Sequence, residues 1–315
     1  MLYDRVAANV RRTYFLIAAF VLLVSALGLA VGYVIGIEYW GLVIALLIAL
    51  TMSWGAYYNS DRVALSVSRA RPADPARDAR LINLVEGLSL AAGIPVPRVY
   101  RVEDDAPNAF ATGRDPEHAA VAVTSGLMKK MSRDELEGVI AHELAHVKNR
   151  DILVMTISVT LIGTVLLISD VMFRAFLWGG LGRRRGGGSG AGAVGAVLAL
   201  LALVLLIVSP IIARVLHFAI SRRREYLADA DALLLTRNPD GLIGALEKLR
   251  SDRTVVRSAS RATAHLWIES PIDGQAAKRR QKPRSWLNNL FNTHPPLDDR
   301  IAALRELAAR PLPTT

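Results

Sequence analysis

The stretch Ser132-Arg-Asp-Glu-Leu-Glu-Gly-Val-Ile-Ala-His-Glu-Leu-Ala-His146 combines the start of a helix with a chemical motif. Ser132 followed three residues later by Glu135 is a capping box, which predicts a helix that begins at Ser132. His142 and His146 lie four residues apart on that helix, so their side chains are separated by about 40° around the axis. The sequence therefore predicts a helix that presents two imidazoles from one face.

His142, Glu143 and His146 form the pattern His-Glu-x-x-His, in which two histidines hold one zinc ion and the glutamate stands beside it. The pattern indicates hydrolysis of a peptide bond. Zinc lowers the pKa of a water molecule, Glu143 takes the proton as the water attacks a carbonyl, and Glu143 returns the proton to the leaving amine. Three protein ligands are usual for catalytic zinc, so a third ligand is expected elsewhere in the chain.

The segment Ser221-Arg-Arg-Arg-Glu-Tyr-Leu-Ala-Asp-Ala-Asp231 supplies the best candidates for that ligand. Glu225 and Asp229 are four residues apart and share one face of a predicted helix. We assign Glu225 to the metal, and we expect Asp229 to accept the free ring N–H of a zinc-bound histidine. The alternative is a solvated, charged helix end. Because the chain has no cysteine, histidine and carboxylate are the ligands expected for one Zn²⁺ per chain.

His294 is our candidate for a second catalytic role, because it precedes two prolines that restrict the backbone. A rigid loop suits a side chain that would donate to the oxyanion together with zinc. The alternative is a histidine that only packs against the last helix or caps it.

Short β-prone segments at residues 96–102, 109–111 and 119–124 predict a small sheet, and residues 75–92 have helical spacing that stops at Gly93. Asn108, Ala109 and Phe110 are the candidate substrate-binding residues, because an extended polypeptide can add a strand beside such a segment. The alternative is that this segment is an internal strand.

Four apolar segments surround these polar stretches. Of the 315 residues 52% are hydrophobic and 21% are charged, and the mean hydropathy is +0.31. Residues 13–37 and 39–60 each exceed the roughly 20 residues that cross a bilayer as a helix, and residues 152–178 and 191–213 form a second pair. We expect a mostly α-helical membrane protein with four transmembrane or membrane-embedded helices and a cytoplasmic α+β domain.

This pattern divides the chain into four parts. Residues 1–60 form an N-terminal transmembrane hairpin, and residues 61–151 form the first part of the soluble domain with the two histidines. Residues 152–213 form a second membrane hairpin. Residues 214–315 complete the soluble domain and carry the third ligand. An antiparallel second hairpin would bring His146 and Glu225 to the same membrane face.

Arginines indicate the orientation. They flank both ends of the first hairpin, whose turn offers only Glu38, so the N-terminus and the soluble domain are expected in the cytoplasm. The loop with Arg183, Arg184 and Arg185 would then lie outside, unless the second hairpin is only embedded in one leaflet. The net charge of +10 and the basic run at residues 278–284 suit anionic headgroups or a solvated loop. No aromatic residues interleave with that run, so no nucleic-acid partner is expected.

Together these motifs resemble the HtpX-type membrane zinc metallopeptidases, bacterial relatives of the CAAX prenyl endopeptidases. The similar stretches, in chain order, are residues 108–113, 120–128, 142–151, 221–232 and 292–301. The resemblance implies a gluzincin-type site with His142, His146 and Glu225 as ligands, on the cytoplasmic side of a bacterial inner membrane. It further implies proteolytic quality control of misfolded or damaged membrane proteins during stress. The chain departs from the family pattern mainly at residues 182–190 and 278–284.

Two other functions compete with this interpretation. An intramembrane protease of the site-2 type also uses His-Glu-x-x-His, but there the motif lies within an apolar span, whereas charged residues surround it here. A non-enzymatic membrane scaffold or metal-binding regulator would keep a degenerate site. The intact Glu143 argues against it, because a structural zinc site does not need that carboxylate.

Overall fold

The computed structural model describes residues 2–158, 222–254, 256, 266–268 and 295–309. In chain order the elements are α1 (Leu2–Ile35), α2 (Tyr39–Val67), β1 (Arg71–Pro72), α3 (Ala79–Ala92), β2 (Arg98–Val102), β3 (Ala109–Thr112), η1 (Pro116–His118), β4 (Ala120–Thr124), α4 (Ser125–Lys130), α5 (Arg133–Lys148), α8 (Arg222–Thr236), α9 (Pro239–Ser251) and α12 (Leu297–Ala308). Residues 151–158 are also helical.

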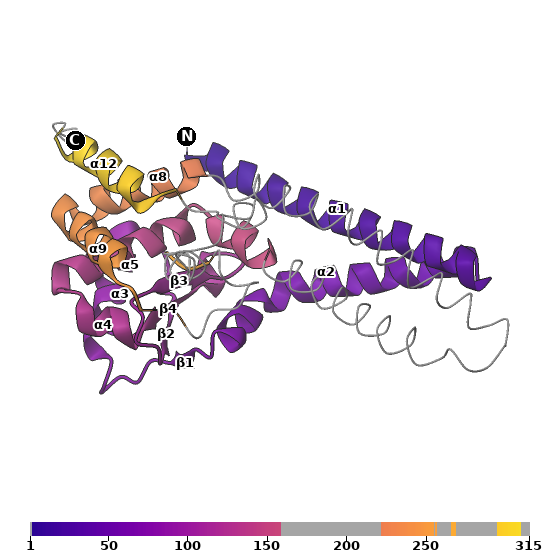
Figure 1. Cartoon of the computed structure of the whole chain (residues 1–315), viewed down its shortest axis with the longest axis horizontal. Coiled ribbons are helices and arrows are strands. Elements are labelled where there is room, and N and C mark those ends of the chain that lie inside the picture. The colour runs from indigo at the N-terminus through magenta and orange to yellow at the C-terminus, as the bar shows by residue number, and fades with distance from the viewer. Residues whose placement is uncertain (1, 159–221, 255, 257–265, 269–294, 310–315) are drawn as a thin grey trace, which may run out of the picture.

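Helices α1 and α2 form a long antiparallel hairpin that projects from the rest of the molecule (Figure 1). Small residues allow the two helices to approach closely. A Cβ on Gly28 would collide with the side chain of Ala45, and a Cβ on Gly32 would collide with the backbone oxygen of Glu38. Gly36 has a positive φ of 81° at the turn, where glycine adopts that conformation without strain. The hairpin is therefore specified by close backbone packing of the kind found between membrane helices.

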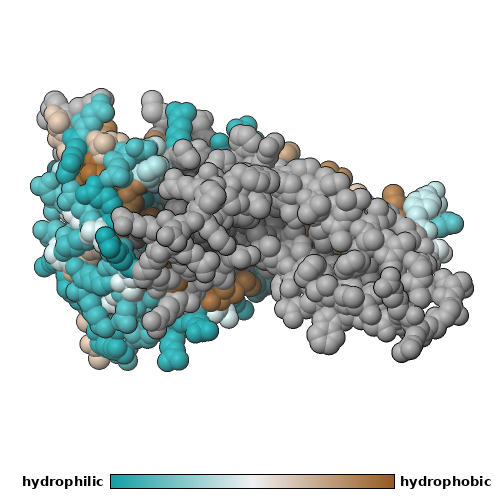
Figure 2. Space-filling view, in the orientation of Figure 1, coloured by the Kyte–Doolittle hydropathy of each residue, from teal (hydrophilic) through white to brown (hydrophobic). Residues whose placement is uncertain are grey.

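Both helices of the hairpin are long and apolar enough to cross a membrane, over Val6–Ala26 and Tyr39–Val67. Large apolar side chains such as Leu22, Leu47 and Trp54 are exposed on them. Hydrophilic residues cover much of the body at the opposite end of the molecule (Figure 2). Helix α2 continues past the expected boundary at residue 60 and ends at Val67. The second expected membrane hairpin lies outside the described residues beyond Ser158.

The body contains a four-stranded sheet in the order β1-β2-β4-β3. Strands β2 and β4 are parallel, whereas β1 pairs with β2 and β3 pairs with β4 in antiparallel fashion. The three strands expected from the sequence are therefore confirmed. The two-residue strand β1 was not expected, because two residues are too short to show a periodic pattern.

Alternating side chains divide the sheet into two faces. Val121 and Val123 of β4 join the core cluster that contains the apolar residues of α5. Ala120 and Ala122 join a second cluster with Phe110, Trp267 and the end of α2. The sheet therefore lies between α5 on one side and the base of the membrane hairpin on the other.

Helix α5 is the centre of the body. The capping box at its start is present, since Ser132 Oγ accepts from Glu135 N and Glu135 Oε2 accepts from Ser132 N at 2.7 Å. Helices α3, α8 and α9 and strand β3 contact α5. A Cβ on Gly138 would lie 2.6 Å from the backbone nitrogen of Leu242, so α9 crosses α5 at close range. Between Leu136 and Val147 all residues but the partly buried Glu137 are buried.

Helix α3 begins at Ala79, so the expected start at residue 75 is wrong. The side chain of Asp74 accepts from the backbone nitrogens of Ala76 and Arg77, and this turn holds the chain out of the helix. The end is as expected, because Gly93 adopts the left-handed conformation with φ 68°.

Candidate metal centre

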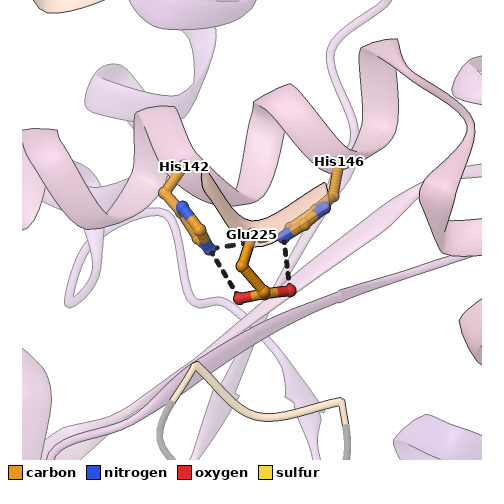
Figure 3. A group of neighbouring side chains, drawn as sticks. All are labelled: His142, His146 and Glu225. Carbon is orange, nitrogen blue, oxygen red and sulfur yellow. Dashed lines mark hydrogen bonds and ion pairs between the residues drawn. The ribbon is translucent and has the colours of Figure 1, made fainter. Parts of the chain in front are cut away.

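His142 and His146 extend from the same face of α5, one turn apart (Figure 3). Their Nε2 atoms are 3.3 Å apart, and their rings meet edge to face. Both side chains are almost completely buried. The helical spacing read from the sequence therefore does bring two ring nitrogens to one point.

Glu225 reaches the same point from α8, and its carboxylate lies across the two imidazoles (Figure 3). Oε2 is 3.8 Å from Nε2 of His142, and Oε1 is 3.6 Å from Nε2 of His146. One ligand atom from each of these three residues lies within 4.8 Å of the other two. The structure thus brings Glu225 to two histidines that precede it by 79 and 83 positions in the sequence.

These separations test whether the three residues fit a zinc ion. Zinc bonds of about 2.0–2.2 Å in a tetrahedral arrangement place neighbouring donor atoms about 3.3–3.6 Å apart. The observed separations of 3.3, 3.6 and 3.8 Å are close to those values. Two imidazoles and one carboxylate are also the donors that zinc accepts in catalytic sites. His142, His146 and Glu225 therefore fit a zinc ion.

Each histidine is oriented by a carboxylate at its other ring nitrogen. Nδ1 of His142 lies 2.9 Å from Asp229 Oδ1, as expected from the sequence. Nδ1 of His146 lies 3.1 Å from Asp151 Oδ2, which was not expected. A carboxylate at Nδ1 favours the tautomer that leaves Nε2 free for a metal. Both rings are therefore held in the orientation that zinc requires.

Arg300 of α12 is the main functional residue that sequence reasoning missed. It is 0% exposed, and it donates from Nε to Asp229 Oδ2 at 2.9 Å and from Nη2 to Asp229 Oδ1 at 2.6 Å. Nη1 lies 3.7 Å from Oε2 of Glu225. Such a two-point pairing fixes Asp229, and through it the ring of His142. In the sequence Arg300 lies within the family-like stretch 292–301, in which only His294 was considered for a role at the site.

The two histidines differ in their affinity for protons. Burial and the nearby charge of Arg300 lower the pKa of His142. Burial also opposes the protonated form of His146, but the hydrogen bond to Asp151 and the charges of Glu225, Asp151 and Glu143 outweigh it and raise the pKa of His146 to about 9. Burial raises the pKa of Asp229, but the charge of Arg300 and its hydrogen bonds prevail and hold that pKa below its usual value.

Glu143 lies on α5 between the two histidines, and its side chain is 2% exposed. Its charge contributes to the raised pKa of His146. Glu143 is therefore a buried carboxylate whose negative charge acts on the ring of His146.

The sequence profile of peptidase family M48 matches residues 75–308, which include every residue of this centre. The chain belongs to peptidase family M48. It is 44% identical over 306 residues to a protease HtpX homolog of Thermoanaerobacter pseudethanolicus, with 97% of this chain and 98% of that protein covered. It is 41% identical to a protease HtpX homolog of Streptococcus uberis, with 98% and 100% covered. The resemblance noted in the sequence is confirmed.

Among solved structures, this protein is similar to the crystal structure of S. mikatae Ste24p. The identity is 17%, the TM-score is 0.45, and the match covers 96% of this chain and 67% of that one.

The remaining expected site residues of this M48 chain fall in two places. His294 lies outside the described residues, as does the Arg183 to Arg185 loop, whose side of the membrane the sequence left open. Asn108, Ala109 and Phe110 are buried, at the start of β3 and along it. The ring of Phe110 packs against Trp267, with the centroids 4.7 Å apart, on the face of the sheet away from α5.

Proposed function

We propose that the chain is a membrane-bound zinc endopeptidase that hydrolyses peptide bonds of misfolded or damaged membrane proteins. It works at the cytoplasmic face of a bacterial inner membrane, as part of protein quality control under stress. The observation that carries the proposal is the convergence of His142, His146 and Glu225 on one point, with Glu143 buried on the same helix as the two histidines. Membership of family M48 supports the same activity.

His142, His146 and Glu225 would hold one Zn²⁺ per chain. When bound, zinc makes a water molecule more acidic and polarises the carbonyl of a substrate. The protein contributes a site that excludes water, because all three ligand residues are at most 3% exposed. Charge interactions inside such a site are stronger than in water.

Glu143 acts as the general base and then as the general acid. It takes the proton of the attacking water and returns that proton to the leaving amine. Its place on α5 supports both roles, because the carboxylate stays on the helix that carries two of the ligands. His294 remains our candidate for a donor to the oxyanion of the tetrahedral intermediate.

An extended substrate would pair with the outer edge of β3. Asn108 O accepts from Thr124 N, so Asn108 faces β4, and the alternate residues Ala109 and Ala111 direct their backbone groups to the outer edge. Ile268 N donates to Ala109 O at 3.0 Å, so a segment of this chain already pairs with the edge there, and a substrate strand would have to replace that contact. Backbone pairing tolerates many side chains, which suits a protease for damaged proteins of varied sequence.

The lipid bilayer would surround the hairpin of α1 and α2. Arg11 and Arg12 near the start of α1 and Arg62 near the end of α2 place positive charge at the end of the hairpin that joins the body. By the positive-inside rule that end faces the cytoplasm. The body and its metal centre would therefore lie on the cytoplasmic side.

The test uses the full-length protein purified in detergent, with a denatured protein as substrate, in the presence and absence of a metal chelator. Replacing Glu143 with Gln should abolish cleavage while the zinc content, measured by elemental analysis, stays at one per chain. Glu137→Gln, the same change on the same helix but at a partly exposed position, should retain activity. Cleavage by zinc-loaded Glu143→Gln protein would remove Glu143 from the mechanism. Wild-type protein that binds zinc but cleaves nothing would favour the scaffold function.

A further inference from the structure

Asn9 is a buried polar residue in the first helix of the membrane hairpin. Its side chain is 3% exposed, and it lies within the segment of α1 that is long and apolar enough to cross a membrane. A buried amide is costly unless its hydrogen-bonding groups are satisfied. The partners of Asn9 are therefore informative about its role.

Among the described residues, the hydrogen-bond partners of the Asn9 side chain lie in the peptidase body. Nδ2 of Asn9 donates to Oδ1 of Asp151 at 2.7 Å and to the backbone oxygen of Asn149 at 3.0 Å. Oδ1 of Asn9 accepts from Nη1 of Arg224 at 3.2 Å. Both N–H groups and the oxygen of the amide are used, which fixes its orientation. These contacts join positions 140 or more residues apart in the chain.

The contacts of Asn9 continue directly to the metal ligands. Asp151 binds Asn9 through Oδ1 and holds Nδ1 of His146 through Oδ2 at 3.1 Å. Arg224 immediately precedes the ligand Glu225 in α8. One asparagine thus contacts the residue that orients one ligand and the residue adjacent to another.

Apolar packing supports the same connection. Leu16 and Phe20 of α1 form a buried cluster with Leu153, Val154 and Ile157, which follow Asp151 in the chain. The first helix therefore packs along the segment that leads out of the metal centre. Asn9 lies at the end of this packed seam nearest Asp151.

We propose that Asn9 is a positioning residue of the metal centre, which fixes Asp151 and thereby the imidazole of His146 for zinc. The first membrane helix is then part of the zinc site as well as an anchor. The inference rests on the proposed zinc site. Asparagine suits the position because it donates to a carboxylate and accepts from an arginine at the same time. Aspartate cannot donate to Asp151, and an apolar residue can do neither.

The test measures the zinc dissociation constant of the full-length protein in detergent by competition with a chromophoric chelator. Two variants remove the donor, Asn9→Ala and Asn9→Asp, the second without loss of volume. Thr13→Ala is the matched control, because Thr13 is buried one turn further along α1 and its hydroxyl donates only to the backbone oxygen of Asn9. Loss of an outer partner of a zinc-bound histidine typically weakens metal binding about 10- to 100-fold.

We expect both Asn9 variants to raise the zinc dissociation constant by at least about tenfold, and Thr13→Ala to leave it unchanged. The visible absorption spectrum of the cobalt-substituted protein should shift in the Asn9 variants only, because it reports ligand geometry and not overall stability. Unchanged affinity and spectrum in both Asn9 variants would overturn the inference. An equal loss in Thr13→Ala would also overturn it, since general packing of α1 would then be the cause.

A double-mutant cycle tests the route through Asp151. In an Asp151→Ala background, Asn9→Ala should weaken zinc binding no further, because the residue through which it acts is gone. Additive losses would contradict that route. Wild-type protein that fails to bind zinc would instead refute the proposed function, so the two failures are distinguishable.

Discussion

The surroundings of His142 and His146 differ although the two rings are one helical turn apart. A carboxylate holds Nδ1 of each ring, at 2.9 Å for His142 and at 3.1 Å for His146. Asp229, the partner of His142, is paired with the fully buried Arg300. Asp151, the partner of His146, receives a neutral amide from Asn9, and Arg224 lies further off at 3.7 Å. The carboxylate beside His146 is therefore less neutralised.

Burial and the charge of Arg300 lower the pKa of His142. At His146 the hydrogen bond to Asp151 and the charges of Glu225, Asp151 and Glu143 outweigh burial and raise the pKa to about 9. Two histidines of one short motif thus differ in proton affinity because different charged residues surround them. Helix α12 near the C-terminus supplies Arg300, and helix α1 at the N-terminus supplies Asn9. The geometry of a motif follows from its helix, whereas its electrostatics follow from the elements packed around it.

Replacing Arg300 is expected to have the largest effect. Arg300→Met leaves Asp229 buried without its cationic partner, and breaking a buried ion pair in this way costs about 3–5 kcal/mol of unfolding free energy. Arg305→Met on the same helix is the matched control, because Arg305 pairs with Glu247 at the surface. An exposed pair contributes at most about 1 kcal/mol. Denaturant unfolding of both metal-free variants measures the difference, and equal losses would contradict the role assigned to Arg300.

The contrast in pKa predicts that zinc binding releases a proton from His146. Below about pH 9 the metal-free ring is protonated, and zinc must displace that proton. His142, with its lowered pKa, is already neutral near pH 7.5 and releases none. Zinc affinity should therefore rise with pH up to about 9 and then level off. Calorimetry at pH 7.5 in two buffers of different ionisation enthalpy counts the protons.

The same proton affects the stability of the metal-free protein, with a sign set by the raised pKa. Because the pKa of His146 is higher in the folded chain than its usual value of about 6.5, protonation stabilises the fold fully below about pH 6.5. That contribution is lost as the pH rises through about 9. Asp151→Asn should reduce both this loss and the proton release, and an unchanged proton count in that variant would refute the role of Asp151.

The smallest effect is expected at the start of α5, because the capping box stabilises the helix as a whole and favours neither histidine. Ser132→Ala removes the side-chain half of the capping box and should lower the unfolding free energy by about 1 kcal/mol. It should not change the zinc dissociation constant, because neither ring nor its carboxylate is touched. Thermal unfolding and the chelator competition together check this. A change in zinc affinity would show that the centre depends on the helix start as well as on its partners.

Much of the centre was predictable because its cause is local. The capping box and the spacing of His142 and His146 depend on residues within two turns of each other. The four-residue interval between Glu225 and Asp229 predicted that both lie on one helix face, and the expected second membrane hairpin supported Glu225 as the third ligand. The end of α3 at Gly93 was predictable for the same reason, whereas its start was misplaced because the turn around Asp74 competes with the helix through side-chain hydrogen bonds.

Arg300, Asp151 and Asn9 were not predictable in this way. None belongs to a repeating pattern, and each acquires its role by burial next to a residue that is distant in the chain, as Asn9 does beside Asp151. Arginine and asparagine face solvent in most proteins, so the residue type alone does not show which arginine or asparagine is buried.

The order of residues along the chain is enough to establish the two-histidine helix, the apolar hairpin, the small sheet and the family, because each rests on local spacing or composition. Which partner pairs with which carboxylate depends on how α1 and α12 pack onto the body, where Asn9 lies beside Asp151 and Arg300 beside Asp229. Charge interactions act through space and strengthen with burial. They are therefore a property of the assembled fold.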